Sequence, residues 1–309
     1  LNPTYADGIG YDYTDYIVAV LVNLQESGFS APLAISIQNE PDFSPIWDGA
    51  NYTLTSDDPQ HYRNLVKDLR IKLNQNGFNS VDILAPDTAE LDTVKKLLGT
   101  PSENGFTALN TDPTFASAVD GFAFHTYSTS GDIHEYQQAF DQYPTKDIWM
   151  TETCLDSGIR GELRATSSDS QLNWTLNFAR RMAGDFVDLG ANYWFFWRAW
   201  SITNSANFEN LLYGNGTSVV QTTKAYSFFQ KLWSIVKPSW TVQQVTDTDT
   251  GPGSLRSDNS DLIQSDSSEQ WSAPVDLLAF ASPDQTQSTV MLVNSSNTAR
   301  SIDALTGLP

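Results

Sequence analysis

The sequence predicts an α/β protein in which helices cover a parallel β-sheet, followed by a small β-rich domain. Short apolar runs alternate with stretches of helical periodicity from about residue 33 to residue 236, and this alternation is typical of βα units. Glycine or proline ends most of these segments, as at Gly28, Gly190 and Pro238. After Trp240 the chain becomes rich in Ser, Asp and Thr, which indicates a change of architecture.

Five strands and six helices are expected in this first part. The strands are short apolar runs, at residues 33–38, 81–85, 121–125, 148–151 and 192–197. Pro86 and Asp87 should close the second of them, because this dipeptide favours a turn. The helices have apolar residues at helical spacing, at residues 13–24, 61–73, 90–98, 133–140, 171–189 and 225–236.

The remaining chain is expected to form a second domain of antiparallel strands. Residues 275–280 and 289–293 alternate apolar and polar side chains, as strands with one buried face do. The predicted domains are therefore residues 1–238 and 239–309, with the boundary near Pro238.

Composition excludes several partners and indicates where the protein acts. The net charge of −20 argues against nucleic acid and against anionic membrane surfaces, because both need a basic face. No apolar run approaches the roughly 20 residues that cross a bilayer. The acidity, the scarcity of lysine and four Asn-x-Ser/Thr sequons favour an extracellular, secreted glycoprotein, which we expect to be a monomer. The sequons lie at Asn51, Asn173, Asn215 and Asn294.

Two apolar strands end on a glutamate. Glu40 follows Asn39 after the first strand, and Glu152 follows Thr151 about 110 residues later. If the two strands are the fourth and seventh of a barrel, their carboxyl ends face each other across its mouth, where such folds place catalytic residues. Cleaving a glycosidic bond needs a proton donor and a partner for the developing positive centre. The alternatives are that both are ordinary loop carboxylates, or that the fold is not a barrel.

Aromatic side chains gather near the predicted strand ends and suit the apolar faces of sugars. Trp47 and Trp194 are expected to contact substrate, whereas Trp149 is expected to pack in the core. His125 ends a strand and is either a hydrogen-bond partner of the substrate or a buried, satisfied histidine. The histidine spacing does not suggest a catalytic metal site, and the proposed chemistry needs no cofactor. The side chain of Cys154 is expected to have a packing role.

Several segments, in order along the chain, resemble the retaining glycoside hydrolases of clan A, and most closely glycoside hydrolase family 30. The resemblance covers most of residues 13–240 and lies in "SIQNEPDF", "DGFAFHTYS", "WMTE", "ANYWFFWRAW" and "KAYSFFQKLWSIVKPSW". It implies a (β/α)8 TIM barrel with a β-sandwich-like side domain. It also makes Glu40 the acid/base and Glu152 the nucleophile of a double displacement, places Asn39 on a substrate hydroxyl, and places Tyr127 close to the nucleophile.

The chain departs from this family at its start. At about 30 residues per βα unit, roughly 100 residues should precede the strand that leads to Glu40, but 32 residues precede residue 33. We therefore expect a barrel that lacks its first three βα units.

The resemblance favours the endo-xylanase branch, with β-1,4-xylan or glucuronoxylan as the polysaccharide substrate. Arg198 lies about where some of those enzymes bind a glucuronate side group, although a salt bridge at the barrel rim is the alternative. A β-1,6-glucanase, a glucosylceramidase-like hydrolase and a non-catalytic carbohydrate-binding remnant remain open.

Overall fold

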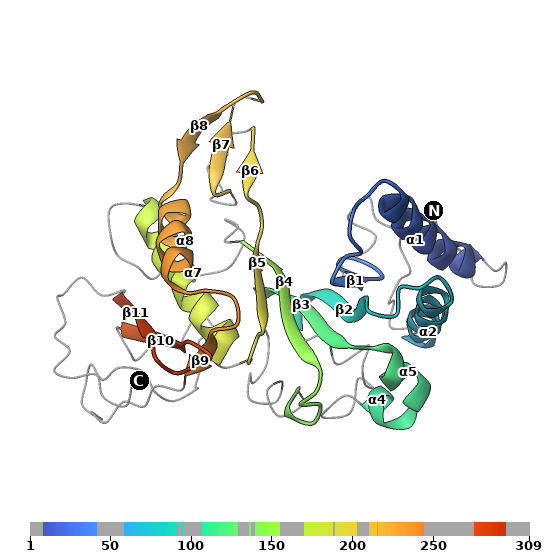
Figure 1. Ribbon diagram of the computed structural model, residues 1–309. Helices are drawn as coiled ribbons and strands as arrows, with labels where there is room; N and C mark the ends of the chain where they lie inside the picture. Colours follow the sequence, from blue (N-terminus) through green and yellow to red (C-terminus); the bar gives the residue numbers. More distant parts are fainter. Residues whose placement is uncertain are drawn as a thin grey trace. The chain divides into compact units, whose positions relative to one another are not determined.

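The computed structural model describes most of the predicted elements and divides the chain into two compact units (Figure 1). The described residues are 9–41, 59–91, 94, 107–128, 136, 140–154, 170–187, 189–202, 210–214, 216–243 and 275–294. The first unit comprises Leu1–Gly131, Glu135–Glu152 and Asn192–Trp194; the second comprises Asp132–His134, Thr153–Ala191 and Phe195–Pro309.

A five-stranded sheet has its strands in the order of the chain. These strands are β1 (Ala34–Ser36), β2 (Asp82–Glu90), β3 (Gly121–Ser128), β4 (Asp147–Thr153) and β5 (Tyr193–Phe196). The pairs β1–β2, β2–β3 and β3–β4 are parallel, and the N–H of Asn192, just before β5, donates to the carbonyl of Ile148 at 2.7 Å. The alternation of strands and helices read from the sequence is thus confirmed. A five-stranded parallel sheet in this order is consistent with part of a (β/α)8 barrel.

Among the described residues of the first unit, four helices have defined bounds: α1 (Ile9–Glu26), α2 (Pro59–Gln75), α4 (Thr107–Thr111) and α5 (Pro113–Ala118). In α2, Leu65, Leu69 and Leu73 recur every four residues and are almost fully buried, which is the apolar stripe that the sequence pattern predicts. The short helices α4 and α5 were not predicted. Asp112 begins α5 by accepting the N–H of Phe115 at 2.9 Å. The predicted helices at 90–98 and 133–140 lie mostly outside the described residues.

Alternate side chains of the strands pack in two different layers. Phe122 and Phe124 of β3 stack against Phe140, with ring centroids 5.2 and 5.6 Å apart. Trp149 of β4 instead joins a buried cluster with Leu84 and Ala123. Its ring also stacks on Tyr193, with centroids 3.7 Å apart, so Trp149 is a packing residue, as expected from the sequence.

The prediction for the end of β2 was wrong. The strand does not stop at Ala85 but continues through Pro86 and Asp87 to Glu90. Its pairing with β3 shifts register between Pro86 and Thr88 and resumes beyond. Asp87 adopts a φ of +62°. Local irregularities of this kind allow a strand to accommodate a proline, which cannot donate a hydrogen bond to the neighbouring strand. A local turn signal was therefore overridden by pairing with a neighbouring strand.

The described residues of the second unit include two helices and a three-stranded antiparallel sheet. These are α7 (Ser170–Val187), α8 (Lys224–Ile235), β9 (Thr241–Gln243), β10 (Val275–Ala281) and β11 (Ser288–Asn294). Phe178 of α7 packs edge-on against Phe229 of α8, and both contact Phe196. The antiparallel strands predicted near 275–280 and 289–293 are confirmed, whereas the domain boundary near Pro238 stays a prediction.

A further small sheet in this unit was not predicted. It consists of β6 (Trp200–Ser201), β7 (Leu212–Gly214) and β8 (Val219–Thr222). The side chain of Trp200 lies so close to Gly214 that a Cβ there would come within 2.2 Å of its ring. Among the described residues, no helix is both long and apolar enough to cross a membrane.

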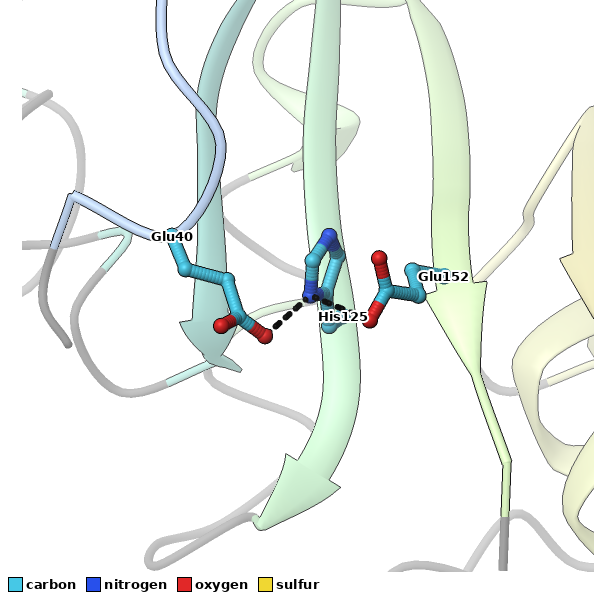
Figure 2. A group of neighbouring side chains, drawn as sticks. All are labelled: Glu40, His125 and Glu152. Atoms are coloured by element: carbon cyan, nitrogen blue, oxygen red, sulfur yellow. Dashed lines mark hydrogen bonds and ion pairs between the residues drawn. The ribbon is translucent and has the colours of Figure 1, made fainter. Parts of the chain in front are cut away.

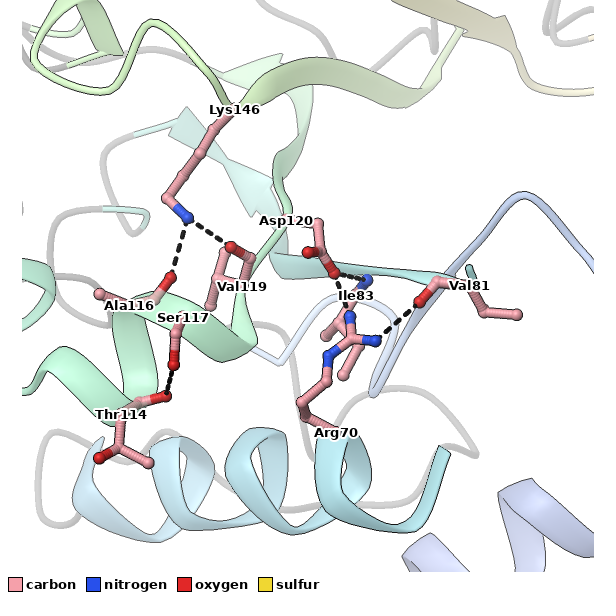
Figure 3. A network of polar contacts seen from close by, with 9 residues as sticks. All are labelled: Arg70, Val81, Ile83, Thr114, Ala116, Ser117, Val119, Asp120 and Lys146. Carbon is pink, nitrogen blue, oxygen red and sulfur yellow. Dashed lines mark hydrogen bonds and ion pairs between the residues drawn. The ribbon is translucent and has the colours of Figure 1, made fainter. Parts of the chain in front are cut away.

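A polar network ties the amino ends of β2, β3 and β4 to the neighbouring helices (Figure 3). Arg70 of α2 donates to the carbonyl of Val81 at 3.1 Å and forms an ion pair with Asp120, just before β3. Asp120 also accepts the N–H of Ile83 at 2.8 Å. Lys146 donates to the carbonyls of Ala116 and Val119 at the end of α5. Arg70 thus satisfies acceptors of two strands at once.

Replacing Arg70 by Met should destabilise the protein by about 1–3 kcal/mol, because the Asp120 carboxylate and the Val81 carbonyl would lose a charged donor. Urea unfolding measures this loss. Lys237→Met is the matched control: Lys237 is an exposed lysine that contacts a single carbonyl, so its loss should cost less than about 0.5 kcal/mol. Equal stabilities of the two variants would contradict the role given to Arg70.

Candidate active site

Glu40 is placed by a turn that follows β1. Its φ is +44°, a left-handed conformation that is uncommon for a residue with a side chain. Its N–H donates to the carbonyl of Asp87 in β2 at 2.9 Å. The turn is therefore fastened to the neighbouring strand, and the Glu40 side chain is largely covered, with 11% of it exposed.

His125 and Glu152 lie side by side on adjacent parallel strands. In the register of β3 and β4, Phe124 pairs with Met150 and His125 pairs with Glu152. One extra residue is thus accommodated in β4 between the two pairs. Such irregularities change the direction in which side chains point and recur next to active sites. Here the shift brings the two functional side chains to the same level at the carboxyl end of the sheet.

The two glutamates converge on the imidazole of His125 (Figure 2). The Nδ1 atom of His125 is 2.9 Å from Oε1 of Glu40 and 3.9 Å from Oε1 of Glu152. One ligand atom from each of the three residues lies within 4.8 Å of the other two. The carboxylates predicted from the sequence are therefore brought together over one histidine.

Asp87, in β2, lies on the Nε2 side of the imidazole of His125. Its Oδ1 is 3.6 Å from Nε2 of His125. The hydroxyl of Ser36 donates to its Oδ2 at 2.6 Å, and the hydroxyl of Thr151 donates to its Oδ1 at 2.5 Å. A buried carboxylate stays ionised only when it is paired and hydrogen-bonded, and Asp87 meets both conditions.

His125 and Asp87 stabilise each other in their charged forms. Burial by itself would lower the pKa of His125, but Asp87 and Glu40, together with the charge of Glu152, raise it to about 9. Burial would raise the pKa of Asp87, but His125 and the Ser36 and Thr151 hydroxyls hold it below its usual value. At neutral pH the site therefore contains an imidazolium cation that faces the carboxyl groups of Asp87, Glu40 and Glu152.

The same three side chains have the ligand types and spacing that a divalent cation would accept. An imidazolium, however, has no lone pair at Nδ1 to offer a metal, and its Nδ1–H donates a hydrogen bond to Oε1 of Glu40 at 2.9 Å. We do not assign these residues as metal ligands, and the absence of a metal or cofactor from the reaction stays a prediction.

The other predicted site residues have different outcomes. Asn39 is exposed beside Glu40, and Trp194 is half-buried in β5. Trp47 lies outside the described residues, as does the side chain of Tyr127, whose backbone belongs to β3. Arg198 is in the second unit, where its Nε donates to the side-chain oxygen of the buried Asn210 at 2.9 Å. Substrate contacts by these residues stay predictions.

Three functional neighbours were missed from the sequence: Asp87, Ser36 and Thr151. A signal for Asp87 was present, because it follows the apolar run of β2 just as Glu40 and Glu152 follow theirs. The proline before it favoured a turn, so the carboxylate was assigned to a loop. Ser36 and Thr151 have no signal of their own, since hydroxyls in strands are common.

No protein family model matches the sequence, and no curated protein matches it. Solved structures of glycoside hydrolases do match. A GH30 endoxylanase from Clostridium papyrosolvens is 19% identical and has a TM-score of 0.59, with 95% of this chain and 57% of that chain covered. An endo-β-1,6-glucanase is 18% identical and has a TM-score of 0.61, with coverage of 95% and 57%.

A conserved exported protein from Bacteroides fragilis is 15% identical and has a TM-score of 0.65, with 94% of this chain and 60% of that chain covered. The chain thus spans 57–60% of the length of these three structures. At such low identity the likeness concerns the fold. The chain has the fold of these proteins, one of which is a GH30 endoxylanase, over the part that is shared.

The raised pKa of His125 should make the stability of the protein depend on pH. A folded-state pKa of about 9, above the ordinary value of 6.5, contributes stability that is complete below pH 6.5 and is lost as the pH rises through about 9. The difference corresponds to roughly 3 kcal/mol. Urea unfolding of wild type and His125→Gln between pH 6 and 10 measures it: the two curves should converge at high pH. Parallel curves would contradict the protonated state of His125.

Proposed function

We propose that the protein is a retaining glycoside hydrolase that cleaves β-linked polysaccharide chains internally. The observation that carries this proposal is the convergence of Glu40, which follows β1, and Glu152, which lies in β4, at the carboxyl ends of the strands of a parallel sheet. An oxygen of one lies within 4.8 Å of an oxygen of the other. Retaining enzymes hold their carboxyl groups about 5–5.5 Å apart, whereas inverting enzymes need about 6.5–9.5 Å to admit a water molecule.

The reaction would proceed in two displacements. A carboxylate oxygen of Glu152 attacks the anomeric carbon, the glycosidic C–O bond breaks, and its electron pair and a proton from Glu40 go to the leaving oxygen. Water then attacks the anomeric carbon of the glycosyl-enzyme and gives its proton to Glu40, and the Glu152 carboxylate leaves. Glu40 thus acts first as acid and then as base.

His125 has a natural part in this sequence. As Glu40 gives up its proton, it becomes a carboxylate that already faces the Nδ1–H of an imidazolium at 2.9 Å. A charge-assisted hydrogen bond to this developing carboxylate stabilises the product side of proton transfer. His125 is therefore a partner of the acid/base, whereas the sequence left open whether it contacts substrate or is a buried, satisfied histidine.

Xylan or glucuronoxylan is the substrate that the sequence motifs favour. The protein would then be secreted and would act on plant cell-wall polysaccharide outside the cell. The solved structures of similar fold include both an endoxylanase and an endo-β-1,6-glucanase, so β-1,6-glucan has equal support from the fold. One of them is described as an exported protein, in keeping with an extracellular role. A glycolipid hydrolase and a non-catalytic carbohydrate-binding protein are the further candidates.

Glu152→Gln should reduce turnover by about 10⁴-fold or more, because it removes the nucleophile but keeps the size of the side chain. Glu40→Gln should behave similarly with unactivated substrates. Initial rates and circular dichroism together separate lost chemistry from lost fold. Glu26→Gln, at the end of α1, is the matched surface control and should retain full activity. Near-normal rates in Glu152→Gln would end the assignment.

Incubation with glucuronoxylan, linear β-1,4-xylan, β-1,6-glucan and glucosylceramide should yield products from one substrate class, identified by mass spectrometry. Internal cleavage releases oligosaccharides of several lengths from the start of the reaction, whereas an exo-acting enzyme releases a single small product. Binding of xylo-oligosaccharides without any product would favour the carbohydrate-binding alternative. Absence of both binding and products would contradict the proposed function.

A further inference from the structure

Asp87 is a buried acid to which the proposed reaction assigns no step. It lies in β2, which stands between β1 and β3 in the sheet, and 6% of the residue is exposed. The position is an unusual one for a carboxylate, because an ionised group loses its hydration when it enters the protein interior. Its surroundings must therefore supply what water would otherwise provide.

Hydroxyl groups from strands on both sides of Asp87 supply some of the hydrogen bonds that water would otherwise provide. Ser36 belongs to β1 and donates to Oδ2 at 2.6 Å, whereas Thr151 belongs to β4 and donates to Oδ1 at 2.5 Å. The Thr151 hydroxyl also lies 3.3 Å from the carbonyl of Phe124. A hydroxyl has one proton, so the closer acceptor, Asp87, receives it. The carboxylate is thus fixed in orientation by two donors, one at each oxygen.

Asp87 contacts both the histidine and the segment that carries the acid/base. Its Oδ1 lies 3.6 Å from Nε2 of His125, on the opposite side of the ring from Nδ1. Its backbone carbonyl accepts the N–H of Glu40 at 2.9 Å. A single residue therefore constrains the imidazole through its side chain and the Glu40 backbone through its main chain.

We propose that Asp87 is a positioning residue: it fixes the ring of His125 and the backbone of Glu40 so that Nδ1 faces the carboxylates of Glu40 and Glu152. This inference rests on the proposed function, because positioning has a purpose only if the two glutamates react. Asp87 itself touches neither substrate nor the reacting atoms in this scheme. It acts through His125, whose Nε2 lies 3.6 Å from Oδ1 of Asp87 while Nδ1 lies 2.9 Å from Oε1 of Glu40.

The ionisable groups around His125 are the carboxylates of Asp87 in β2, Glu40 after β1 and Glu152 in β4. Tyr62 of α2 is fully buried, and its pKa is raised by burial and by the charge of Asp87. Asp87 is held in place by two hydroxyls and can therefore define the orientation of the ring. Removing the charge of Asp87 should therefore change the titration midpoint of His125 even without substrate.

Asp87→Asn is the variant of choice. Asparagine is among the residues that best tolerate the φ of +62° found here, and it keeps a hydrogen-bonding oxygen while losing the charge. We expect the titration midpoint of His125, followed by NMR of its ring protons, to fall by about one pH unit or more. We expect kcat to fall roughly 10- to 100-fold, as when the outer partner of a functional histidine is removed, with KM changed less than about threefold.

Asp112→Asn is the matched control. Asp112 also accepts hydrogen bonds, from the N–H of Phe115 and from Lys67, but at the start of α5. Its replacement should lower stability while leaving the His125 midpoint and kcat unchanged. A role of Asp87 limited to joining strands would make the two variants behave alike.

Ser36→Ala provides a second route if Asp87→Asn does not fold. It removes one anchor and keeps the charge, so we expect a smaller fall in kcat, about 3- to 10-fold, again with little change in KM. A folded Asp87→Asn with an unchanged His125 midpoint and kcat within twofold of wild type would overturn the proposal. So would an unfolded Asp87→Asn together with a Ser36→Ala variant of normal kcat.

The NMR titration does not depend on any substrate, which keeps the two proposals separable. If wild type hydrolyses nothing in the panel but the His125 midpoint falls in Asp87→Asn, the proposed function fails while the contact between Asp87 and His125 stands. If wild type is active and the midpoint and kcat do not change, the hydrolase assignment stands and the positioning role is wrong.

Discussion

The arrangement of the site depends on keeping one negative charge inside a β-sheet. Asp87 remains ionised there because two hydroxyls and an imidazolium replace its lost hydration. The same charge, in turn, keeps His125 protonated although it is almost fully buried. Neither group would be stable in its charged form without the other. This mutual dependence puts a cation at the point where Glu40 and Glu152 meet.

The register shifts described for the five-stranded sheet lie at this level, which explains how the groups come together. β2 shifts its pairing after Pro86, β3 and β4 shift between Phe124 and His125, and Glu40 has a left-handed backbone. A regular parallel sheet would point successive side chains to opposite faces. The shifts break this alternation at the carboxyl ends of the strands, so that side chains from three strands and one turn reach the same small volume.

The shared fold and the proposed chemistry place different constraints on the protein. An endoxylanase and an endo-β-1,6-glucanase have the same fold as this chain at 18–19% identity. Two carboxylates about one sugar ring apart suffice for hydrolysis by double displacement, whichever linkage is bound. The choice of linkage depends instead on groups that line the sugar-binding subsites, where aromatic faces and a few hydrogen-bonding side chains distinguish one polysaccharide from another.

Local patterns in the sequence determined the order of strands and helices and placed Glu40 and Glu152 at strand ends, because periodicity and turn residues are properties of neighbouring residues. They did not reveal the small sheet of β6–β8, because its strands are only two to four residues long and so show too little periodicity to be recognised. They also misplaced Asp87, since Pro86 signals a turn and only β3 makes the strand continue. That His125 is protonated, and that Asp87 holds it, was decided by tertiary structure alone, because the pKa of a buried group is set by whatever the fold packs against it.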